Sequence, residues 1–348
     1  MSPVLNPRRL RSRLLDWYDA GARDLPWRVG PRERARGVRP EPYRVWLSEV
    51  MLQQTTTAHA APYFLAFVRR WPTAADLAGA DDAEVMAAWA GLGYYARARN
   101  LLACARAVAA RPGGAFPEDE PGLRALPGVG AYTAAAVAAI AFDRPANVVD
   151  GNVERVMARL FAVAAPLPDA KPELKRLAGA LVTQERPGDW AQALMDLGAV
   201  VCRPRAPLCD RCPLREDCRA HAAGDPEDFP GRAARKERPR RHGAAFVVRR
   251  GANVGLVRRP PKGLLGGMLA LPTTDWTAAA PPPPPAGAWR PLGDVEHVFT
   301  HFALTLRAYE GAAWDGDLIW TPAAEAQAAM PSVFAKVLRL SLASARSE

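Results

Sequence analysis

Four of the five cysteines lie in one short segment and have a spacing that suits metal binding. They are Cys202, Cys209, Cys212 and Cys218, separated by six, two and five residues. Four thiolates in so short a span can hold a 4Fe–4S cluster or a zinc ion. Structural zinc sites usually have two well-separated Cys-x2-Cys pairs, whereas this segment has one. The pattern therefore favours a 4Fe–4S cluster, with zinc as the alternative.

Two carboxylates stand where acid–base chemistry is possible. Glu49 has Val45, Trp46 and Leu52 at helical spacing, and apolar surroundings raise the pKa of a carboxyl group and favour its protonated form. A protonated Glu can act as a general acid; the alternative is a structural ion pair with a nearby Arg. Asp150 precedes a predicted helix whose first amide groups favour an ionised carboxylate. Cleavage of a glycosidic bond needs one carboxyl group of each kind.

A glycine-rich turn precedes Asp150. Leu126-Pro127-Gly128-Val129-Gly130 leads into an alanine-rich helix predicted over residues 132–142. Glycines permit positive φ and close backbone approach, and free N–H groups at the start of a helix bind anions. The turn is typical of a helix-hairpin-helix motif that holds a nucleic-acid phosphate. An ordinary αα-hairpin is the alternative.

A series of helices must position these groups. Apolar periodicity predicts almost no strand before residue 240. Pro42 is expected to begin the helix that carries Glu49, because proline suits the first helical turn. Residues 29–41 are expected to form an Arg-rich loop. Further helices are predicted over residues 10–20, 60–70, 82–90, 96–110, 122–126, 132–142, 152–161, 171–184 and 190–201.

The last third of the chain has a different pattern. Residues 219–241 are rich in Pro, Gly and charge, which predicts a linker. Residues 244–248 and 254–257 flank a turn and predict a β-hairpin. Residues 301–309 alternate in hydrophobicity, and residues 332–343 are expected to be helical. These elements predict a separate α+β domain.

Composition and charge limit the class of protein. A chain of 348 residues is expected to form two or three domains. The net charge of +10 is local, because residues 1–40 hold ten Arg and four acidic residues and residues 231–250 hold eight basic residues and one acidic residue. Such segments suggest a polyanionic partner, with solubility or a basic linker as the alternative. Without an apolar spanning stretch or a signal-peptide pattern, we expect a cytoplasmic protein and no membrane partner.

Five motifs together resemble the helix-hairpin-helix DNA glycosylases related to endonuclease III, and specifically the MutY-type adenine DNA glycosylases. They are VWLSEVMLQQTTT, GLGYYARARNL, LPGVGAYTAAAV, VVDGNVERV and the four-cysteine segment. The resemblance covers roughly residues 8–220, and the C-terminal third resembles that family's Nudix-like domain more weakly. It implies a mainly α fold. The implied parts are an iron–sulfur helical domain over 1–35 and 148–222, a six-helix barrel over 36–147, a linker over 223–241 and a Nudix-like domain over 242–348.

The resemblance implies a monomeric enzyme that excises adenine mispaired with 8-oxoguanine or G in double-stranded DNA, after flipping the adenine out of the helix. Glu49 would protonate adenine N7 and Asp150 would stabilise the sugar cation. Tyr132 and Asn152 would order the site around Asp150. Bifunctional endonuclease III enzymes have a lysine at the position of Tyr132, and no lysine precedes Lys171 here. The resemblance therefore implies a glycosylase that leaves an abasic site.

Contacts to DNA or adenine are also implied by the resemblance. Trp27 and Arg28 would line the adenine pocket, and Gln192 would help to read the adenine edge. Gln54 and Tyr94 would form a wedge that enters the base stack, and Leu52 would pack near the orphan base. Gly128 and Gly130 belong to the phosphate-binding turn.

In the C-terminal third, Phe299-Thr300-His301 resembles the family's loop that recognises 8-oxoguanine, with Thr300 where the family has Ser. Residues 263–272 resemble a family segment but lack its Trp-Glu pair, and the acid-rich Nudix catalytic box is missing. We therefore expect base recognition and no diphosphate hydrolysis from this domain.

Two other functions remain open. One is another mismatch or oxidised-base glycosylase on the same scaffold, and the other is a non-catalytic iron–sulfur DNA-binding protein. The presence of both Glu49 and Asp150 argues against the second. The 29–41 loop is longer than the family's connection, and we hypothesise that its arginines make extra phosphate contacts. They are Arg32, Arg34, Arg36 and Arg39.

Overall fold

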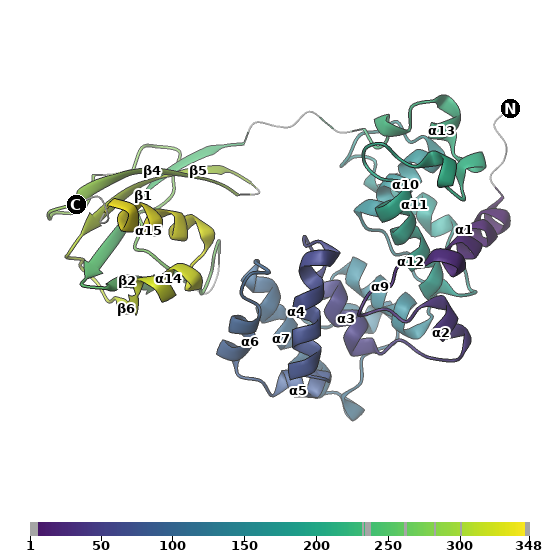
Figure 1. Cartoon of the computed structure of the whole chain (residues 1–348), viewed down its shortest axis with the longest axis horizontal. Helices are drawn as coiled ribbons and strands as arrows, with labels where there is room; N and C mark the ends of the chain where they lie inside the picture. Colours follow the sequence, from purple (N-terminus) through teal and green to yellow (C-terminus); the bar gives the residue numbers. More distant parts are fainter. Residues whose placement is uncertain are drawn as a thin grey trace. The chain divides into compact units, whose positions relative to one another are not determined.

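The computed structural model of the chain describes residues 6–344 except 232, 234–237, 261–262, 282 and 300. The chain divides into two compact units, residues 1–234 and 235–348. The first is built from helices and the second from a sheet with helices against it (Figure 1). None of the described helices combines the length and the apolar character needed to cross a membrane.

The first unit places its key helices where the sequence predicts them. Helix α3 (Pro42–Met51) begins at the expected proline, and the Glu41 carboxylate caps it. Helix α9 (Ala131–Phe142) follows the glycine turn, and α10 (Gly151–Phe161) begins directly after Asp150. The other helices and turns are α1 (Pro7–Gly21), α2 (Pro31–Ala35), α4 (Thr57–Arg70), α5 (Ala74–Ala78), α6 (Asp82–Ala88), α7 (Tyr95–Ala109), η1 (Pro112–Gly114), α8 (Glu120–Arg124), α11 (Lys171–Ala180), α12 (Pro187–Asp196), η2 (Leu197–Val201), η3 (Cys209–Arg211), η4 (Arg215–Asp217), α13 (Arg219–Ala223) and η5 (Pro226–Asp228).

Two local predictions are corrected. The expected loop over residues 29–41 contains α2, because Pro31 suits the first turn and the Glu33 carboxylate accepts a hydrogen bond from the Gly30 amide at 3.1 Å. The predicted helix over residues 190–201 ends as an α-helix at Asp196 and continues as the π-helical turn η2 into the cysteine segment.

Two apolar cores lie inside the first unit. One is formed mainly by α3 to α9, and the other by α1, α10, α11 and α12. Ala191 of α12 belongs to the first core, whereas its neighbours Trp190 and Ala193 belong to the second. Helix α12 therefore packs against both cores at once.

Glycines at both ends of α12 allow its backbone to approach the backbones of α9 and α10 closely. A Cβ added at Gly188 would lie 2.6 Å from the carbonyl oxygen of Ala139 in α9. A Cβ added at Gly198, just after α12, would lie 2.5 Å from Cβ of Asn152 in α10. Larger residues would force these helices apart, so the contacts fix α12 between α9 and α10.

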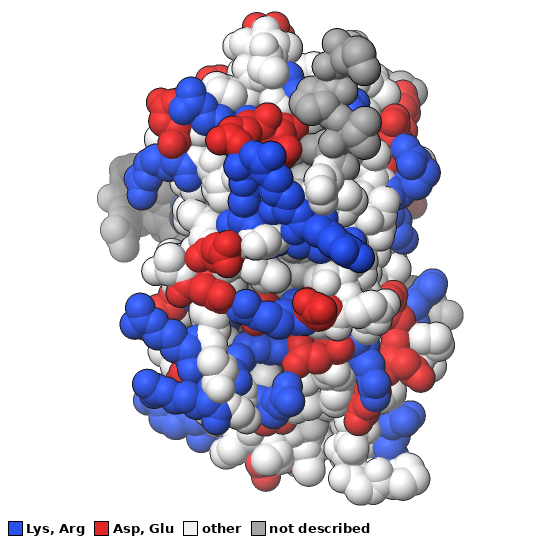
Figure 2. Space-filling view, turned by 90° about the vertical axis from the view of Figure 1, so that its right-hand side faces the viewer, with Lys and Arg blue, Asp and Glu red and all other residues white. Residues whose placement is uncertain are grey.

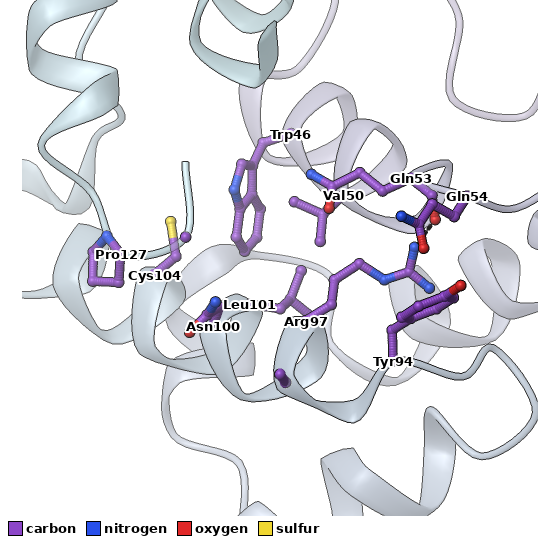
Figure 3. A pocket seen from close by; sticks show the side chains of 12 residues that line it. Trp46, Val50, Gln53, Gln54, Tyr94, Arg97, Asn100, Leu101, Cys104 and Pro127 are labelled. Carbon is purple, nitrogen blue, oxygen red and sulfur yellow. Dashed lines mark hydrogen bonds between the residues drawn. The ribbon is translucent and has the colours of Figure 1, made fainter. Parts of the chain in front are cut away.

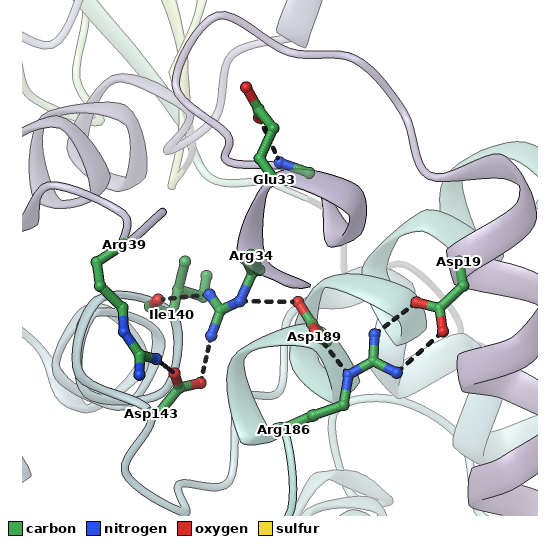
Figure 4. Close-up of polar contacts among 9 residues, drawn as sticks. Asp19, Glu33, Arg34, Arg39, Ile140, Asp143, Arg186 and Asp189 are labelled. Atoms are coloured by element: carbon green, nitrogen blue, oxygen red, sulfur yellow. Dashed lines mark hydrogen bonds and ion pairs between the residues drawn. The ribbon is translucent and has the colours of Figure 1, made fainter. Parts of the chain in front are cut away.

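A chain of ion pairs holds α1, α2, α9 and α12 together (Figure 4). Arg186, just before α12, pairs with Asp19 of α1 and with Asp189 of α12. Arg34 of α2 pairs with Asp189 at 3.3 Å and with Asp143, which follows α9. The Arg34 side chain is only 9% exposed. The hypothesised phosphate contact is therefore wrong for Arg34, and stays a prediction for the other three arginines of that segment.

The described residues of the second unit form a sheet with two helices. Strand β1 pairs with β2 as the expected antiparallel hairpin and with β5 in parallel, and β4 pairs antiparallel with β5. The strand order is β3-β2-β1-β5-β4, with β6 beside β2. The core includes alternate residues of β5, as predicted, packed with residues of α15. The elements are β1 (Arg240–Arg250), β2 (Asn253–Arg258), β3 (Leu269–Ala270), β4 (Arg290–Val298), β5 (Ala303–Gly311), β6 (Ile319–Pro322), α14 (Ala323–Ala329) and α15 (Ser332–Ser344).

Candidate active site

A cavity of about 760 Å³ in the first unit is lined by both candidate carboxylates. Glu49 lies on α3, which contributes to the first apolar core, and Asp150 directly precedes α10, which contributes to the second. The structure thus brings together residues that lie a hundred positions apart in the sequence. The predicted site residues that line this cavity are Trp27, Arg28, Glu49, Leu52, Gln54, Tyr132, Asp150, Asn152 and Gln192.

Glu49 is buried, with 6% of its surface exposed. Burial raises the pKa of Glu49 from 4.5 to about 7. A hydrogen bond from Tyr132 and the charge of Arg28 lower it, and the charge of Asp150 raises it. The raised pKa favours the protonated form of Glu49, which a general acid requires.

Asp150 has the opposite environment. It is the N-cap of α10, and its Oδ1 accepts a hydrogen bond from the Val153 amide at 2.7 Å. Its Oδ2 accepts a second from Nδ2 of Asn152 at 2.8 Å. Hydrogen-bond donors and the positive end of the helix dipole both stabilise a negative carboxylate. The two carboxyl groups of the cavity are thus prepared for different tasks.

Arg28 is held on the cavity wall by a residue that sequence reasoning missed. Asp196, at the end of α12, is fully buried, and it accepts hydrogen bonds from Nη1 of Arg28 and Nε of Arg23, both at 2.6 Å. Nε of Arg28 has no partner among the described residues. One signal in the sequence was available, because Asp196 lies four residues after Gln192 and so shares its helix face.

Gln192 presents a second unused donor. The residue is 3% exposed and lines the cavity from α12, and its Nε2 has no hydrogen-bond partner in the described part of the chain. Buried polar groups in proteins are nearly always paired. A ligand with an acceptor at its edge would therefore satisfy this amide.

Lys171 also lines the cavity, although nothing in the sequence placed it there. It begins α11, and its Nζ forms an ion pair with Oε1 of Glu154 in α10 at 3.0 Å. Among the described residues that line the cavity, Lys171 therefore supplies the amine, and a carboxylate holds it.

Three other predicted DNA contacts lie around the glycine turn, outside the main cavity. Tyr94 and Gly128 line a neighbouring cavity together with Gln54. Gly128 has φ +71°, and an added Cβ would lie 2.6 Å from Cβ of Asn100, so only glycine fits there. Gly130 is the N-cap of α9 and offers no side-chain cap to the first amides of the helix.

The predicted base-recognition loop belongs to the second unit. Phe299 stacks on Trp276 with a ring-centroid distance of 5.7 Å, and His301 is exposed. Thr300 lies outside the described residues. Phe299 thus has a structural partner within its own unit.

The four cysteines of the metal-binding motif line one small cavity of about 30 Å³. Arg159 of α10 is buried there; its Nη1 donates to Sγ of Cys202 at 3.4 Å, and its carbonyl accepts from Sγ of Cys218 at 3.5 Å. Among the described residues, no group of three or more His, Cys, Asp or Glu side chains is arranged to hold a metal ion. Burial raises the pKa of the Cys209, Cys212 and Cys218 thiols, and the positive charge of Arg159 acts in the opposite direction on Cys209.

A hydrogen-bonded path connects this segment to Asp150. Asn152, the partner of Asp150, accepts a hydrogen bond at its Oδ1 from Arg155 at 2.9 Å. Arg155 also donates to the carbonyl oxygens of Gly198 and Cys202, both at 2.8 Å. The orientation of Asp150 therefore depends on the backbone that leads into the cysteine segment.

Two arginines of α1 form ion pairs with acidic residues of the same segment. Arg9 and Arg13 both pair with Glu216, at 2.7 and 2.6 Å, and Arg13 also lies 3.5 Å from Asp217. Figure 2, viewed from the side on which α1 and α13 lie, shows basic and acidic residues interspersed. Part of the positive charge of residues 1–40 is therefore balanced inside the protein and is not available to a polyanion.

Comparisons with known proteins show which families the two units of the chain resemble. The family described as HhH-GPD superfamily base excision DNA repair protein matches residues 47–181, and the NUDIX domain family matches residues 244–340. The chain is 38% identical to human adenine DNA glycosylase over 88% of its own length and 67% of the human protein. It is 43% identical to the Mycolicibacterium smegmatis adenine DNA glycosylase, over 61% of this chain and 70% of that one.

Solved structures show the same helical fold. A thermostable thymine-DNA glycosylase is 30% identical with a TM-score of 0.54, and covers 62% of this chain and 97% of its own. A trapped endonuclease III–DNA covalent intermediate has a TM-score of 0.51 at 24% identity, over 64% of this chain and 99% of its own, which shows the fold alone.

Proposed function

Because the chain belongs to the adenine DNA glycosylase family, we propose that it removes adenine from double-stranded DNA in base excision repair. The substrate is adenine mispaired with 8-oxoguanine or G. One observation carries the proposal: the buried Glu49, whose pKa is raised by burial, and the hydrogen-bonded carboxyl group of Asp150 line a single cavity of about 760 Å³.

The reaction follows from these two groups. Glu49 donates its proton to N7 of the extruded adenine, the bond between C1′ and N9 breaks, and its electron pair leaves with the base. Asp150 stabilises the positive sugar. Water then adds at C1′ and returns a proton to the Glu49 carboxylate, which leaves an abasic site. Tyr132 and Asn152 order the site around Asp150: Asn152 donates a hydrogen bond to it, and Tyr132 lines the cavity beside both carboxyl groups.

Adenine is recognised by unsatisfied donors of the cavity wall. Nε2 of Gln192 and Nε of Arg28 have no partner among the described residues, and a purine offers ring-nitrogen acceptors at its edge. Trp27 supplies an aromatic surface on the same cavity. The second unit is proposed to recognise the opposite 8-oxoguanine through the loop at residues 299–301.

We further propose that Cys202, Cys209, Cys212 and Cys218 hold a 4Fe–4S cluster. The four thiols line one cavity next to the buried guanidinium of Arg159, which suits an anionic cluster. The segment has a single Cys-x2-Cys pair, which favours a cluster over structural zinc. When bound, the cluster would act as a structural cross-link within this segment.

The experiment uses four duplexes, containing A opposite 8-oxoguanine, A opposite G, T opposite G and thymine glycol opposite A. We expect adenine release from the first two, with strand cutting only after alkali. Release of thymine, as from the thymine-DNA glycosylase that shares this fold, would refute the substrate. Cutting without alkali would refute the monofunctional reaction, and Lys171→Ala would then show whether the amine in the cavity is responsible.

A further inference from the structure

A second cavity lies beside the candidate active site, and the reaction above gives it no role. Its volume is about 260 Å³, and it lies between the end of α3, the first turns of α7 and the glycine turn before α9 (Figure 3). Gln54 lines both cavities. Arg97 reaches up from α7 toward Gln53 and Gln54, with Tyr94 beside its guanidinium (Figure 3).

Arg97 is a buried cation with an unusual set of partners. The residue is 8% exposed. Its Nη1 donates to the carbonyl oxygen of Gln53, and its Nη2 donates to the carbonyl oxygen of Leu92 at 3.1 Å. The guanidinium carbon lies 5.2 Å from the ring centroid of Trp89 and 5.6 Å from that of Tyr94. No carboxylate pairs with it within the described part of the chain, so carbonyl dipoles and aromatic rings are its counterparts.

The two segments that Arg97 joins each contain a strained residue. Gln54, which follows Gln53, has φ +57°, and Tyr94, two residues after Leu92, has φ +52°. Residues other than glycine rarely adopt this left-handed conformation and keep it only where their surroundings enforce it. Tyr94 is nevertheless 60% exposed, so its conformation is not explained by burial of its own ring.

We propose that Arg97 is a positioning residue that holds Gln54 and Tyr94 as one preformed wedge. The resemblance described above implies that Gln54 and Tyr94 enter the base stack as the target nucleotide leaves it, so this inference rests on the proposed function. Arg97 contacts the backbone just before Gln54 and the ring of Tyr94, and so couples two loops that the sequence separates by forty residues. Ordering both loops before DNA binds avoids the entropic cost of ordering them on the DNA.

The guanidinium group suits this task better than an amine. Its planar fork bonds to two carbonyl groups in fixed directions while its face stacks on aromatic rings. A lysine would keep the charge but contact one segment at a time. The variants Arg97→Gln and Arg97→Lys therefore separate loss of the charge from loss of the bridge.

The test compares two substrates under single-turnover conditions with excess enzyme. In one duplex adenine lies opposite G, and in the other it lies opposite an abasic site, where there is little pairing to break and no orphan base to hold. Arg106→Gln is the matched control, because Arg106 also lies on α7 and bonds to the carbonyl groups of Ala78 and Ala80, outside both cavities.

We expect Arg97→Gln to slow release opposite G by about 10- to 100-fold, as expected for lost hydrogen bonds to a charged group. Release opposite the abasic site should slow by less than about threefold, Arg97→Lys should fall in between, and Arg106→Gln should change neither rate. Because each rate is measured with excess enzyme, the comparison does not depend on the folded fraction. Equal slowing on both substrates, or no slowing on either, would overturn the role of Arg97. Failure of the wild type to release adenine would instead refute the proposed function.

Discussion

Replacing Glu49 with Gln should abolish adenine release and at the same time stabilise the folded protein, increasingly so as the pH rises. Burial raises the pKa of Glu49 to about 7, whereas the carboxyl group in the unfolded chain titrates near 4.5. The folded protein therefore binds more protons than the unfolded chain between these pH values. The free energy of unfolding consequently falls as the pH rises from about 4.5 to about 7. Glutamine is neutral at every pH and removes this loss.

The magnitude follows from the two pKa values. Each pKa unit corresponds to about 1.4 kcal/mol, so ionisation of Glu49 lowers the free energy of unfolding of the wild type by about 3 kcal/mol in total. Most of this decrease occurs between pH 5 and pH 8. In a protein of this size, that free energy changes the melting temperature by about 5–10 °C. The melting temperature of Glu49→Gln relative to wild type should rise by this amount on going from pH 5 to pH 8.

Thermal unfolding of both proteins at the two pH values measures the effect. The double difference cancels every other titrating group. Glu84→Gln, on the exposed surface of α6, is the control and should give the same difference from wild type at both pH values. A difference in melting temperature between Glu49→Gln and wild type that does not depend on pH would refute the reasoning, because Glu49 would then not be protonated in the folded protein.

The wild-type rate of adenine release should also fall about tenfold per pH unit above about 7, as the general acid loses its proton.

Two further predictions concern the surroundings of the carboxylates. Cys212→Ser should remove the broad visible absorbance expected of a 4Fe–4S cluster and lower the melting temperature. The control Cys104→Ser should keep the absorbance. An unchanged spectrum in the Cys212 variant would refute the assignment of Cys212 as a ligand. Gly198→Ala should slow adenine release by at least about tenfold, because the added Cβ would lie 2.5 Å from Cβ of Asn152 and would displace this partner of Asp150. The control is Gly21→Ala, because an added Cβ there would meet open space. Normal activity of the Gly198 variant would show that the spacing of α10 and η2 is not critical.

The parts of the fold that depend on local chemistry were predictable from the sequence. Pro42 marks the start of α3, and the turn at Gly128 marks the start of α9, because both residues act through their own backbone. The alternation before Tyr309 likewise predicts a strand with one buried face, and β5 has it. Helix α2 was missed although Pro31 and Glu33 are suitable capping residues, since the arginines around them suggested an exposed loop.

The contacts that cross the fold were not predictable. Arg34 reads as one more arginine of a basic segment, and its partners Asp143 and Asp189 lie more than a hundred residues away. Lys171 lines the cavity because α11 packs beside α10, and Asp196 reaches Arg23 and Arg28 because α12 packs beside α1. Nothing in the periodicity of a single sequence reports such a packing arrangement. That Glu49 and Asp150 lie at one cavity was expected from the resemblance of their motifs and from the reaction that needs two carboxyl groups.

The glycines that flank α12 have a consequence for engineering. Gly188 packs against the backbone of Ala139, and Gly198 packs against Asn152. The distance between the helices that line the cavity is therefore set by contacts of the backbone and not by the size of side chains. A bulkier or smaller base cannot be accommodated by letting α12 slide, since no flexible side chain absorbs the movement. Attempts to retarget the cavity should therefore trim or exchange the inward-facing groups Gln192 and Met195, and leave the scaffold glycines untouched.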